Sequence, residues 1–354
     1  MTRRGWSLLL LAALLALGGC AETRMVMRAD PAALAGPALV WPGAPEQARY
    51  RYAGQLFGED NFVEEGGQQR SAGVKLLRWL VGLAGQQQSI TLKRPQSGAA
   101  DGHGRVYVSD IGSHAVFVFD RAAGKLLVWE MAEPNRRFAT PVGVALGAGG
   151  EILVADAALG KVFRLARDGT PLGHFGGGLL ERPTGLARDA ARGRIYVADT
   201  HAHDIKVFDD AGKLLGVVGK RGEGEGELNF PTHLAFGGDT LYVSDSINAR
   251  VVKFDADGKP AGTLGERGQY IGNLTRPKGV ALDPEGNLYV VESMHDHLLV
   301  FDRAGSLLLP IGGTGKEPGQ FYLPSGAWSD QHGMIYVADM FNGRIVMFQF
   351  LGGA

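Results

Sequence analysis

Six acidic residues recur along the chain, each at the end of a short run of β-branched and aromatic residues. Their spacings are 46, 43, 46, 47 and 47 residues. The positions are Asp110, Asp156, Asp199, Asp245, Glu292 and Asp339. A carboxylate at a strand end can work as a general base, ligate a metal or accept hydrogen bonds from loop amides. Because it returns in every repeat, we interpret the set as structural: each accepts loop N–H groups and pairs with a basic residue five positions later.

Histidines are the other groups that could carry chemistry. Two close pairs, His201 with His203 and His295 with His297, have spacings that could ligate zinc. Both pairs fall in the short turn that follows an acidic position. The interpretation that we favour is therefore ordinary turn residues, with metal binding as the alternative, and no metal site is predicted.

A third set of residues follows six prolines that lie 14 to 16 positions before the acidic residues. In four repeats glycine stands two positions after the proline, whereas His233 takes that place in the fourth repeat. Glu292 lengthens the acidic side chain in the fifth. These departures point to a ligand site where the repeats meet. Its residues are Gln96, Thr184, Thr232, His233, Lys278, Ser325 and Glu292. The alternative is a channel mouth that is polar only because it is wet, as in any propeller.

The elements that must position these residues are short strands. Each repeat contains a strand after the proline, a hairpin of two β-rich strands around the acidic residue, and a fourth strand after a glycine turn. A period of this length with glycine-rich connections is typical of a blade repeat. The fold class is therefore all-β, a six-bladed β-propeller with four-stranded blades, the prolines starting the innermost strands.

The sixth repeat has no fourth strand of its own, because the sequence ends soon after Phe350. Residues 49–58 (RYRYAGQLFG) have the pattern of a fourth strand but precede the first blade. We expect this N-terminal strand to complete the last blade and so close the ring, which removes an exposed sheet edge.

The segments DTHAHDIKVFDDAG and DSINARVVKFDADG, the latter followed by GKRGEGEGELNFP, resemble NHL-repeat six-bladed β-propellers. The resemblance covers about residues 49–354 and implies a fold, not a reaction. In the family pattern the third residue after the acidic position is Asn and the fifth is Arg. His295 and His297 stand at those two positions in blade five.

The N-terminus resembles that of a bacterial lipoprotein. Residues 1–19 have a basic start and a short apolar segment, as in a signal peptide, and Cys20 is the only cysteine. Leu17-Gly18-Gly19-Cys20 resembles a lipobox, which implies lipidation at Cys20, and Ala21 implies sorting to the outer membrane. Residues 20–48, rich in Ala and Pro, are predicted to be an extended tether.

Residues 59–94 form a connection longer than those between the other blades, so they are predicted to be an insertion on the channel-mouth face. Residues 74–84 have apolar residues at helical spacing, so we expect a helix there. It would be a lid packed on the propeller. The alternative is an exposed helix that contacts a partner or a membrane surface through Trp79, Lys75 and Arg78.

The formal net charge of −1 gives no electrostatic basis for nucleic-acid binding. We therefore expect a lipid-anchored cell-envelope propeller that binds a protein, peptide or glycan at the channel mouth without a cofactor and without catalytic residues. It would face the periplasm or the cell surface. The alternative is a metal-dependent hydrolase or lyase whose site at the channel uses His233, Lys278 and Glu292.

Overall fold

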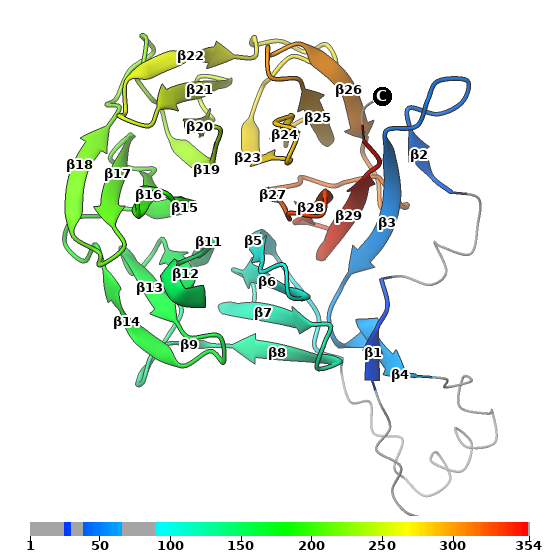
Figure 1. Ribbon diagram of the computed structural model, residues 1–354, viewed down its shortest axis with the longest axis horizontal. Helices are drawn as coiled ribbons and strands as arrows, with labels where there is room; N and C mark the ends of the chain where they lie inside the picture. The colour runs from blue at the N-terminus through cyan, green and yellow to red at the C-terminus, as the bar shows by residue number, and fades with distance from the viewer. Residues whose placement is uncertain (1–24, 30–37, 66–88, 353–354) are drawn as a thin grey trace, which may run out of the picture.

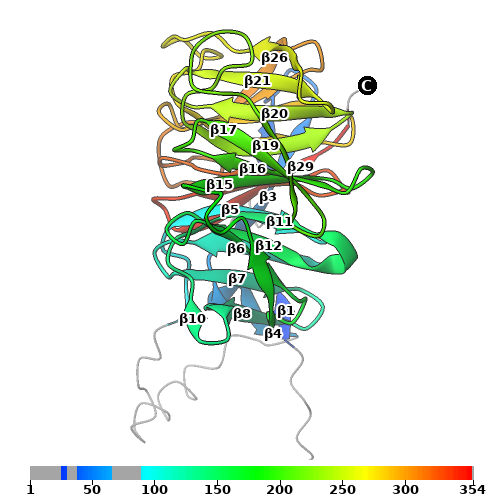
Figure 2. The same cartoon turned by 90° about the vertical axis from the view of Figure 1, so that its left-hand side faces the viewer.

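The structure, a computed structural model, describes residues 25–29, 38–65 and 89–352. It consists of six antiparallel sheets arranged around a central axis, with two small two-stranded ribbons at the periphery (Figure 1). The predicted six-bladed all-β propeller is confirmed. Figure 2 shows the disc from its side.

The first three blades each contain four strands, ordered from the axis outwards. Blade one is β5 (Pro95–Ala100), β6 (Arg105–Asp110), β7 (Ala115–Asp120) and β8 (Lys125–Trp129). Blade two is β11 (Pro141–Leu146), β12 (Ile152–Asp156), β13 (Lys161–Leu165) and β14 (Pro171–Phe175). Blade three is β15 (Pro183–Asp189), β16 (Arg194–Asp199), β17 (Asp204–Asp209) and β18 (Leu214–Val218).

The last three blades follow the same order, and the sixth takes strands from both ends of the described chain. Blade four is β19 (Pro231–Gly237), β20 (Thr240–Asp245), β21 (Arg250–Asp255) and β22 (Pro260–Leu264). Blade five is β23 (Pro277–Leu282), β24 (Leu288–Glu292), β25 (His297–Phe301) and β26 (Leu307–Gly312). Blade six is β27 (Ala327–Ser329), β28 (Met334–Asp339), β29 (Arg344–Phe350), β3 (Tyr50–Leu56) and β2 (Val40–Trp41).

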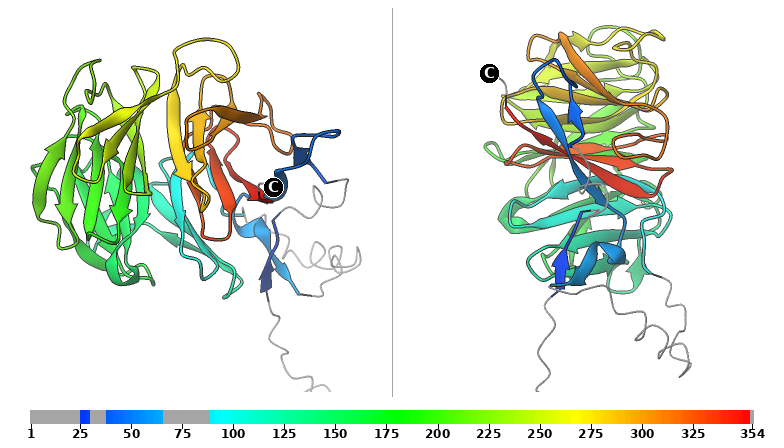
Figure 3. Two further views of the ribbon diagram at one scale, coloured as in Figure 1. Left: turned by 45° about the horizontal axis from the view of Figure 1, so that its top comes forward. Right: turned by 90° about the vertical axis from the view of Figure 1, so that its right-hand side faces the viewer.

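The N-terminal strand closes the ring, as residues 49–58 predict. β3 pairs antiparallel with β29, from Phe350 opposite Tyr50 to Ile345 opposite Leu56. Figure 3 shows the blue N-terminal and red C-terminal strands meeting on one side of the disc. Closure leaves no blade without its fourth strand, so the long edge that an open ring would present is covered.

Parts of the segment predicted to be a tether are attached to the propeller. β1 (Met25–Met27) pairs with β4 (Phe62–Glu64), and β2 adds a fifth strand to blade six. Strands of two or three residues are too short to give a periodic sequence signal, so the pattern did not reveal them.

Several predicted features lie outside the described residues: the signal peptide, Cys20 and the helix over residues 74–84. The described part of the 59–94 insertion contains the 3-10 turn η1 (Glu59–Asn61) and β4, so it gives the predicted helical insertion no support. Elsewhere the structure adds the 3-10 turn η2 (Ala148–Gly150) and the ribbon of β9 (Met131–Glu133) with β10 (Arg136–Arg137). Among the described residues no helix is long and apolar enough to cross a membrane.

The core consists of six hydrophobic clusters, one between each pair of neighbouring blades. Side chains alternate along each strand, so a central strand packs against both adjacent blades and is buried on both faces. Near the axis the backbones approach closely. A Cβ at Gly143 would collide with the Thr184 carbonyl of the next blade, which explains the recurrent glycine.

We call one side of the disc the mouth face. It carries the turns after the six acidic residues and the loops that enter the innermost strands. The opposite face carries the turns between the first and second strands and between the third and fourth strands of each blade.

Candidate functional site

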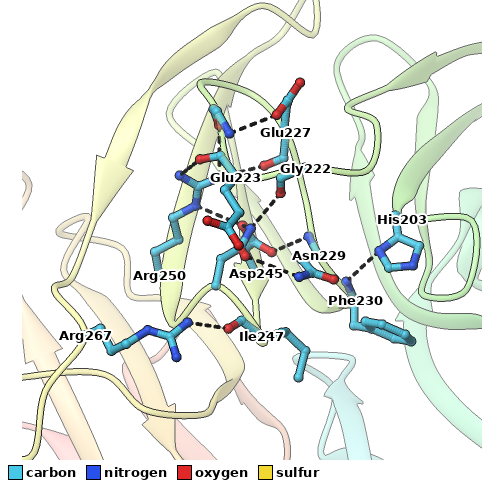
Figure 4. A network of polar contacts seen from close by, with 12 residues as sticks. His203, Gly222, Glu223, Glu227, Asn229, Phe230, Asp245, Ile247, Arg250 and Arg267 are labelled. Carbon is cyan, nitrogen blue, oxygen red and sulfur yellow. Dashed lines mark hydrogen bonds and ion pairs between the residues drawn. The ribbon is translucent and has the colours of Figure 1, made fainter.

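The acidic residue of each blade holds the loop that enters the innermost strand. In blade four, Asp245 accepts hydrogen bonds from the Asn229 N–H (2.6 Å) and from Asn248 Nδ2 (2.7 Å), and it forms an ion pair with Arg250 Nε (2.9 Å). Figure 4 shows this network. Blade six repeats it with Asp339, Asn342 and Arg344. The structural interpretation of these carboxylates is confirmed in both blades.

The other four acidic residues also accept loop N–H groups. The predicted ion pair with a basic residue five positions later is wrong for these four, since among the described residues it forms only in blades four and six. Asp110 and Asp156 each bind two consecutive backbone amides ahead of the innermost strand, and Asp199 does the same. Glu292 reaches the amides of Thr275, Arg276 and Met294, although its side chain is longer. In every blade the carboxylate therefore has the same structural role, which is to accept hydrogen bonds from backbone amides of the adjacent loops.

The predicted channel-mouth residues form a girdle that links neighbouring blades. Thr184 Oγ1 lies 2.7 Å from Thr200 Oγ1 and donates to the Thr232 carbonyl of the next blade (2.9 Å). Thr232 Oγ1 lies 2.7 Å from Ser246 Oγ. On the other side of the ring, Ser325 Oγ donates to Gln96 Oε1 at 3.3 Å. These side chains thus lie in pairs, and their polar atoms are hydrogen-bonded to the adjacent strand or to the neighbouring blade.

His233 is the exception in this ring. It is 7 % exposed, and neither ring nitrogen has a hydrogen-bond partner among the described residues. It lines a central channel of about 190 Å³ to which all six innermost strands contribute. Burial, with a smaller contribution from the charge of Lys278, lowers the pKa of His233 to about 3. The imidazole is therefore neutral at pH 7.

Because the pKa of His233 is lowered, the unfolding free energy of the protein is expected to fall in acid. The unfolded chain has an ordinary histidine pKa of about 6.5, so between pH 6.5 and 3 it binds a proton more readily than the folded protein. Lowering the pH through this window therefore favours unfolding. Between pH 7 and pH 5, wild type should lose about 2 kcal/mol more unfolding free energy than His233→Gly.

Urea unfolding of both proteins at pH 7 and pH 5 measures this difference. Glycine is a safe replacement, because four other blades carry it at the same position: Gly143, Gly185, Gly279 and Gly326. Its extra backbone entropy costs about 1 kcal/mol at both pH values and so cancels from the comparison. Equal losses in the two proteins would show that His233 does not resist protonation.

Lys278 is half-buried beside His233, and its ammonium makes no hydrogen bond or ion pair among the described residues. Burial and the nearby Arg276 lower its pKa. Glu292 lies instead under the loop whose amides it binds. Within the described ranges, no group of three or more His, Cys, Asp or Glu side chains is arranged to hold a metal.

The histidine pairs have local partners. His203 Nδ1 accepts the Phe230 N–H at 3.2 Å, and its ring packs edge-on against Phe230 with centroids 4.4 Å apart. His297 Nδ1 contacts the carbonyl of His295 in its own turn. The environments therefore resemble those of turn residues.

The largest group of exposed large hydrophobic side chains lies on the mouth face. Others lie on the outermost strands, and Met25 lies near the opposite face. Among the described residues, none lies in a turn of the opposite face. Those in blades four to six, together with the loops that enter them, we call the mouth patch. It consists of Phe230, Ile247, Tyr270, Ile271, Met294, Tyr322 and Phe341.

The mouth patch was not predicted, although the sequence carries a signal for it. Ile247, Met294 and Phe341 each stand two positions after the acidic residue, at a turn tip where polar residues are expected. Phe341 packs edge-on against Tyr322 (5.5 Å between centroids), and Arg94 lies over its ring at 5.4 Å. Ile247, Met294 and Phe341 occupy the same position of the repeat, so a comparison of the six turns position by position would have revealed them.

Residues 188–265 match the model of the DUF5128 family, described as a 6-bladed beta-propeller. No protein of curated function matches the chain in sequence. Solved structures are similar in fold. Virginiamycin B lyase from Staphylococcus aureus is 15% identical, with a TM-score of 0.54, and the match covers 73% of this chain and 96% of that chain.

Two further neighbours have different activities. A luciferin-regenerating enzyme is 15% identical with a TM-score of 0.57, covering 74% of this chain and 92% of that one. An auxiliary nutrient binding protein from Bacteroides ovatus is 15% identical with a TM-score of 0.56, covering 73% and 68%. Proteins on this fold thus include a lyase, another enzyme and a binding protein, so function must be argued from this chain's own surface. The comparisons identify the chain as a six-bladed β-propeller.

Proposed function

We propose that this protein is a lipid-anchored propeller of the bacterial cell envelope, of the NHL-repeat type, that binds a protein through the mouth patch. The observation that supports this proposal is the gathering of exposed Ile, Met, Phe and Tyr side chains on one face. Soluble proteins seldom expose contiguous apolar surface without a partner, and aromatic and Met side chains are enriched at protein interfaces. A peptide segment or a glycan on the same face is the alternative occupant.

The anchor would leave this face accessible. Met25, at the start of β1, packs against the turn at Gly124 on the opposite face of blade one. Cys20 precedes it by five residues, a span of at most about 18 Å for an extended chain. A lipid at Cys20 would therefore hold the opposite face towards the membrane and point the mouth patch away from it, in the periplasm or at the cell surface.

The anchor itself is tested by Cys20→Ala. Without the acylated cysteine, the protein should move from the membrane fraction to the soluble fraction, because one buried lipid chain contributes about 0.8 kcal/mol per CH₂ to membrane attachment. Cell fractionation followed by a salt wash measures this. Retention of Cys20→Ala in the washed membranes would contradict the lipoprotein proposal.

Partner binding is tested by charging the mouth patch. The double variant Met294→Asp with Phe341→Asp should reduce recovery of a cross-linked partner by roughly tenfold or more, since a few central side chains dominate most interfaces. Both side chains are about half exposed, so the fold should be retained.

A matched control is available on the outermost strands. Leu172 in β14 and Leu215 in β18 are equally exposed but lie on the rim of the disc. Leu172→Asp with Leu215→Asp should leave partner recovery unchanged. If both double variants recover the partner as wild type does, the mouth patch is not the binding surface.

A further inference from the structure

The loops that enter blades four, five and six share two backbone hydrogen bonds. In each, a glycine N–H donates to a carbonyl six residues later: Gly222 to Leu228 (3.1 Å), Gly268 to Leu274 (3.2 Å) and Gly315 to Phe321 (2.9 Å). The N–H of the residue that ends the loop donates a second hydrogen bond to a carbonyl eight residues earlier, just before the loop. The pairs are Leu228 with Lys220 (2.8 Å), Leu274 with Glu266 (2.8 Å) and Phe321 with Gly313 (2.9 Å). We call residues 222–228, 268–274 and 315–321 the cradle loops.

In blades four and six an arginine fills the cradle loop. Arg250 donates to the carbonyls of Glu223 (2.9 Å), Gly224 (3.0 Å) and Glu227 (2.8 Å) and pairs with Asp245 (Figure 4). Arg344 repeats the arrangement with the carbonyls of Lys316 (2.6 Å) and Gln320 (2.9 Å). A guanidinium suits this position, because its planar set of donors can reach several carbonyls at once.

Blade five has the cradle loop but lacks the arginine. His297 stands at that position, and its ring turns back to the His295 carbonyl of its own turn. A cavity of about 300 Å³ lies between the loop and the turn. By register, the carbonyls of Gln269, Tyr270 and Asn273 correspond to those that bind Arg250 in blade four.

The charges around this cavity also suit a cation. Glu292 lines it, and within the described residues Glu292 has no ion pair, whereas Asp245 and Asp339 each pair with an arginine. The neighbouring cations Arg267 and Arg276 do not line the cavity. Ile271, Met294 and Leu299 supply apolar walls for an aliphatic stem, and the ring of Tyr270 is 85 % exposed beside it.

We propose that the blade-five cavity binds a guanidinium group supplied by a ligand, in the place that Arg250 and Arg344 fill in their own blades. The group would donate to the carbonyls of the cradle loop, with Glu292 balancing its charge and Tyr270 contacting its face. The site shares Tyr270, Ile271 and Met294 with the mouth patch, but it is argued from the cradle loop and Glu292. It rests on the proposed function only for the source of the group, which would be an arginine side chain of the bound protein or the free amino acid.

The probe for this site is N-acetyl-arginine amide, titrated by NMR at pH 8, where an ordinary histidine is uncharged. Wild type should bind it saturably, with shifts at the amides of residues 268–274. N-acetyl-glutamine amide should not bind, because it lacks the charge and most of the donors.

The decisive variant restores the residue that the sibling blades use. His297→Arg should fill the cavity from within, weaken probe binding by roughly tenfold or more, and raise the melting temperature. Tyr270→Ala, at an exposed position that the fold does not need, should weaken binding without changing the melting temperature. Tyr322→Ala, an exposed aromatic in blade six, is its matched control and should bind as wild type does.

Absence of saturable binding, or His297→Arg binding the probe as tightly as wild type, would overturn the proposal. If free arginine binds tighter than the amide probe, the ligand is the amino acid. If an arginine-containing peptide binds tighter, the source is a partner side chain. His297→Arg separates the two proposals, because it fills the cavity and leaves every residue of the mouth patch unchanged. Full partner recovery by this variant would show that the partner does not use this pocket, and reduced recovery would show that it does.

Discussion

Deleting residues 49–58 is expected to abolish the cooperative unfolding transition of the propeller. The deletion removes Tyr50, Tyr52 and Leu56, which are buried between blade six and its two neighbours. Truncation of buried side chains of this size costs about 2–5 kcal/mol each, which together approaches the whole stability of a typical domain. It also leaves the β29 edge open to association. Urea unfolding and size-exclusion chromatography measure both effects.

A rescue variant distinguishes loss of the strand from loss of the N-terminus. Phe350 at the end of β29 lies opposite Tyr50 at the start of β3, so residues 49–58 appended after Ala354 could form the hairpin that the other blades use. This rearranged chain should recover a cooperative transition and remain monomeric. A deleted protein that melts like wild type and stays monomeric would contradict closure by β3.

Arg344→Ala is expected to lower the unfolding free energy by about 3–5 kcal/mol, because it leaves the buried Asp339 carboxylate without its cation. Arg344 is 4 % exposed, and it also binds Gln55 Oε1 of the closing strand at 2.8 Å. One side chain therefore joins the acidic residue, the cradle loop and the N-terminal strand. Chemical denaturation at neutral pH gives the difference.

Arg250→Ala provides the comparison for this variant. Arg250 makes the same contacts in blade four, but 17% of its side chain is exposed and it touches no closing strand. Water can replace part of its contacts, so its loss should cost less than that of Arg344. A cost for Arg344→Ala below about 1 kcal/mol would show that the network is not a buried one.

Much of the architecture could be predicted from sequence, because a blade repeat imposes the same period on strands, turns and acidic residues. The order of the strands, the innermost position of those after the prolines and the closing strand were all predicted correctly. The attachment of β1 and β2 was not. Their pairing depends on partners, β4 and β3, that lie far from them in sequence and leave no local pattern.

The candidate site was predicted less completely than the fold. Sequence singled out Thr184, Thr232 and His233 by their place after a proline. The structure joins Thr184 to Thr232 by a hydrogen bond and places His233 in the wall of the central channel. The sequence could not reveal that the Thr184 hydroxyl donates a hydrogen bond to the neighbouring blade. That outcome depends on the distance between blades, which the packing of whole sheets sets.

The blade-five cavity shows how a repeat can carry functional information. His297 was recognised in the sequence as standing where arginine usually stands. Its consequence depends on the cradle loop, which has the same two backbone hydrogen bonds in blade five as in blades four and six. Only the structure shows that a cavity lies where an arginine at position 297 would otherwise reach.

Site-specific photo-crosslinking in cells shows whether a protein binds the mouth face of blades four to six. A photoreactive residue replacing Met294, exposed in the mouth patch, is compared with one replacing Glu285 on the opposite face. A discrete protein adduct is expected from position 294 and none from position 285. Adducts of equal yield from both positions, or an adduct only from 285, would contradict binding at the mouth face.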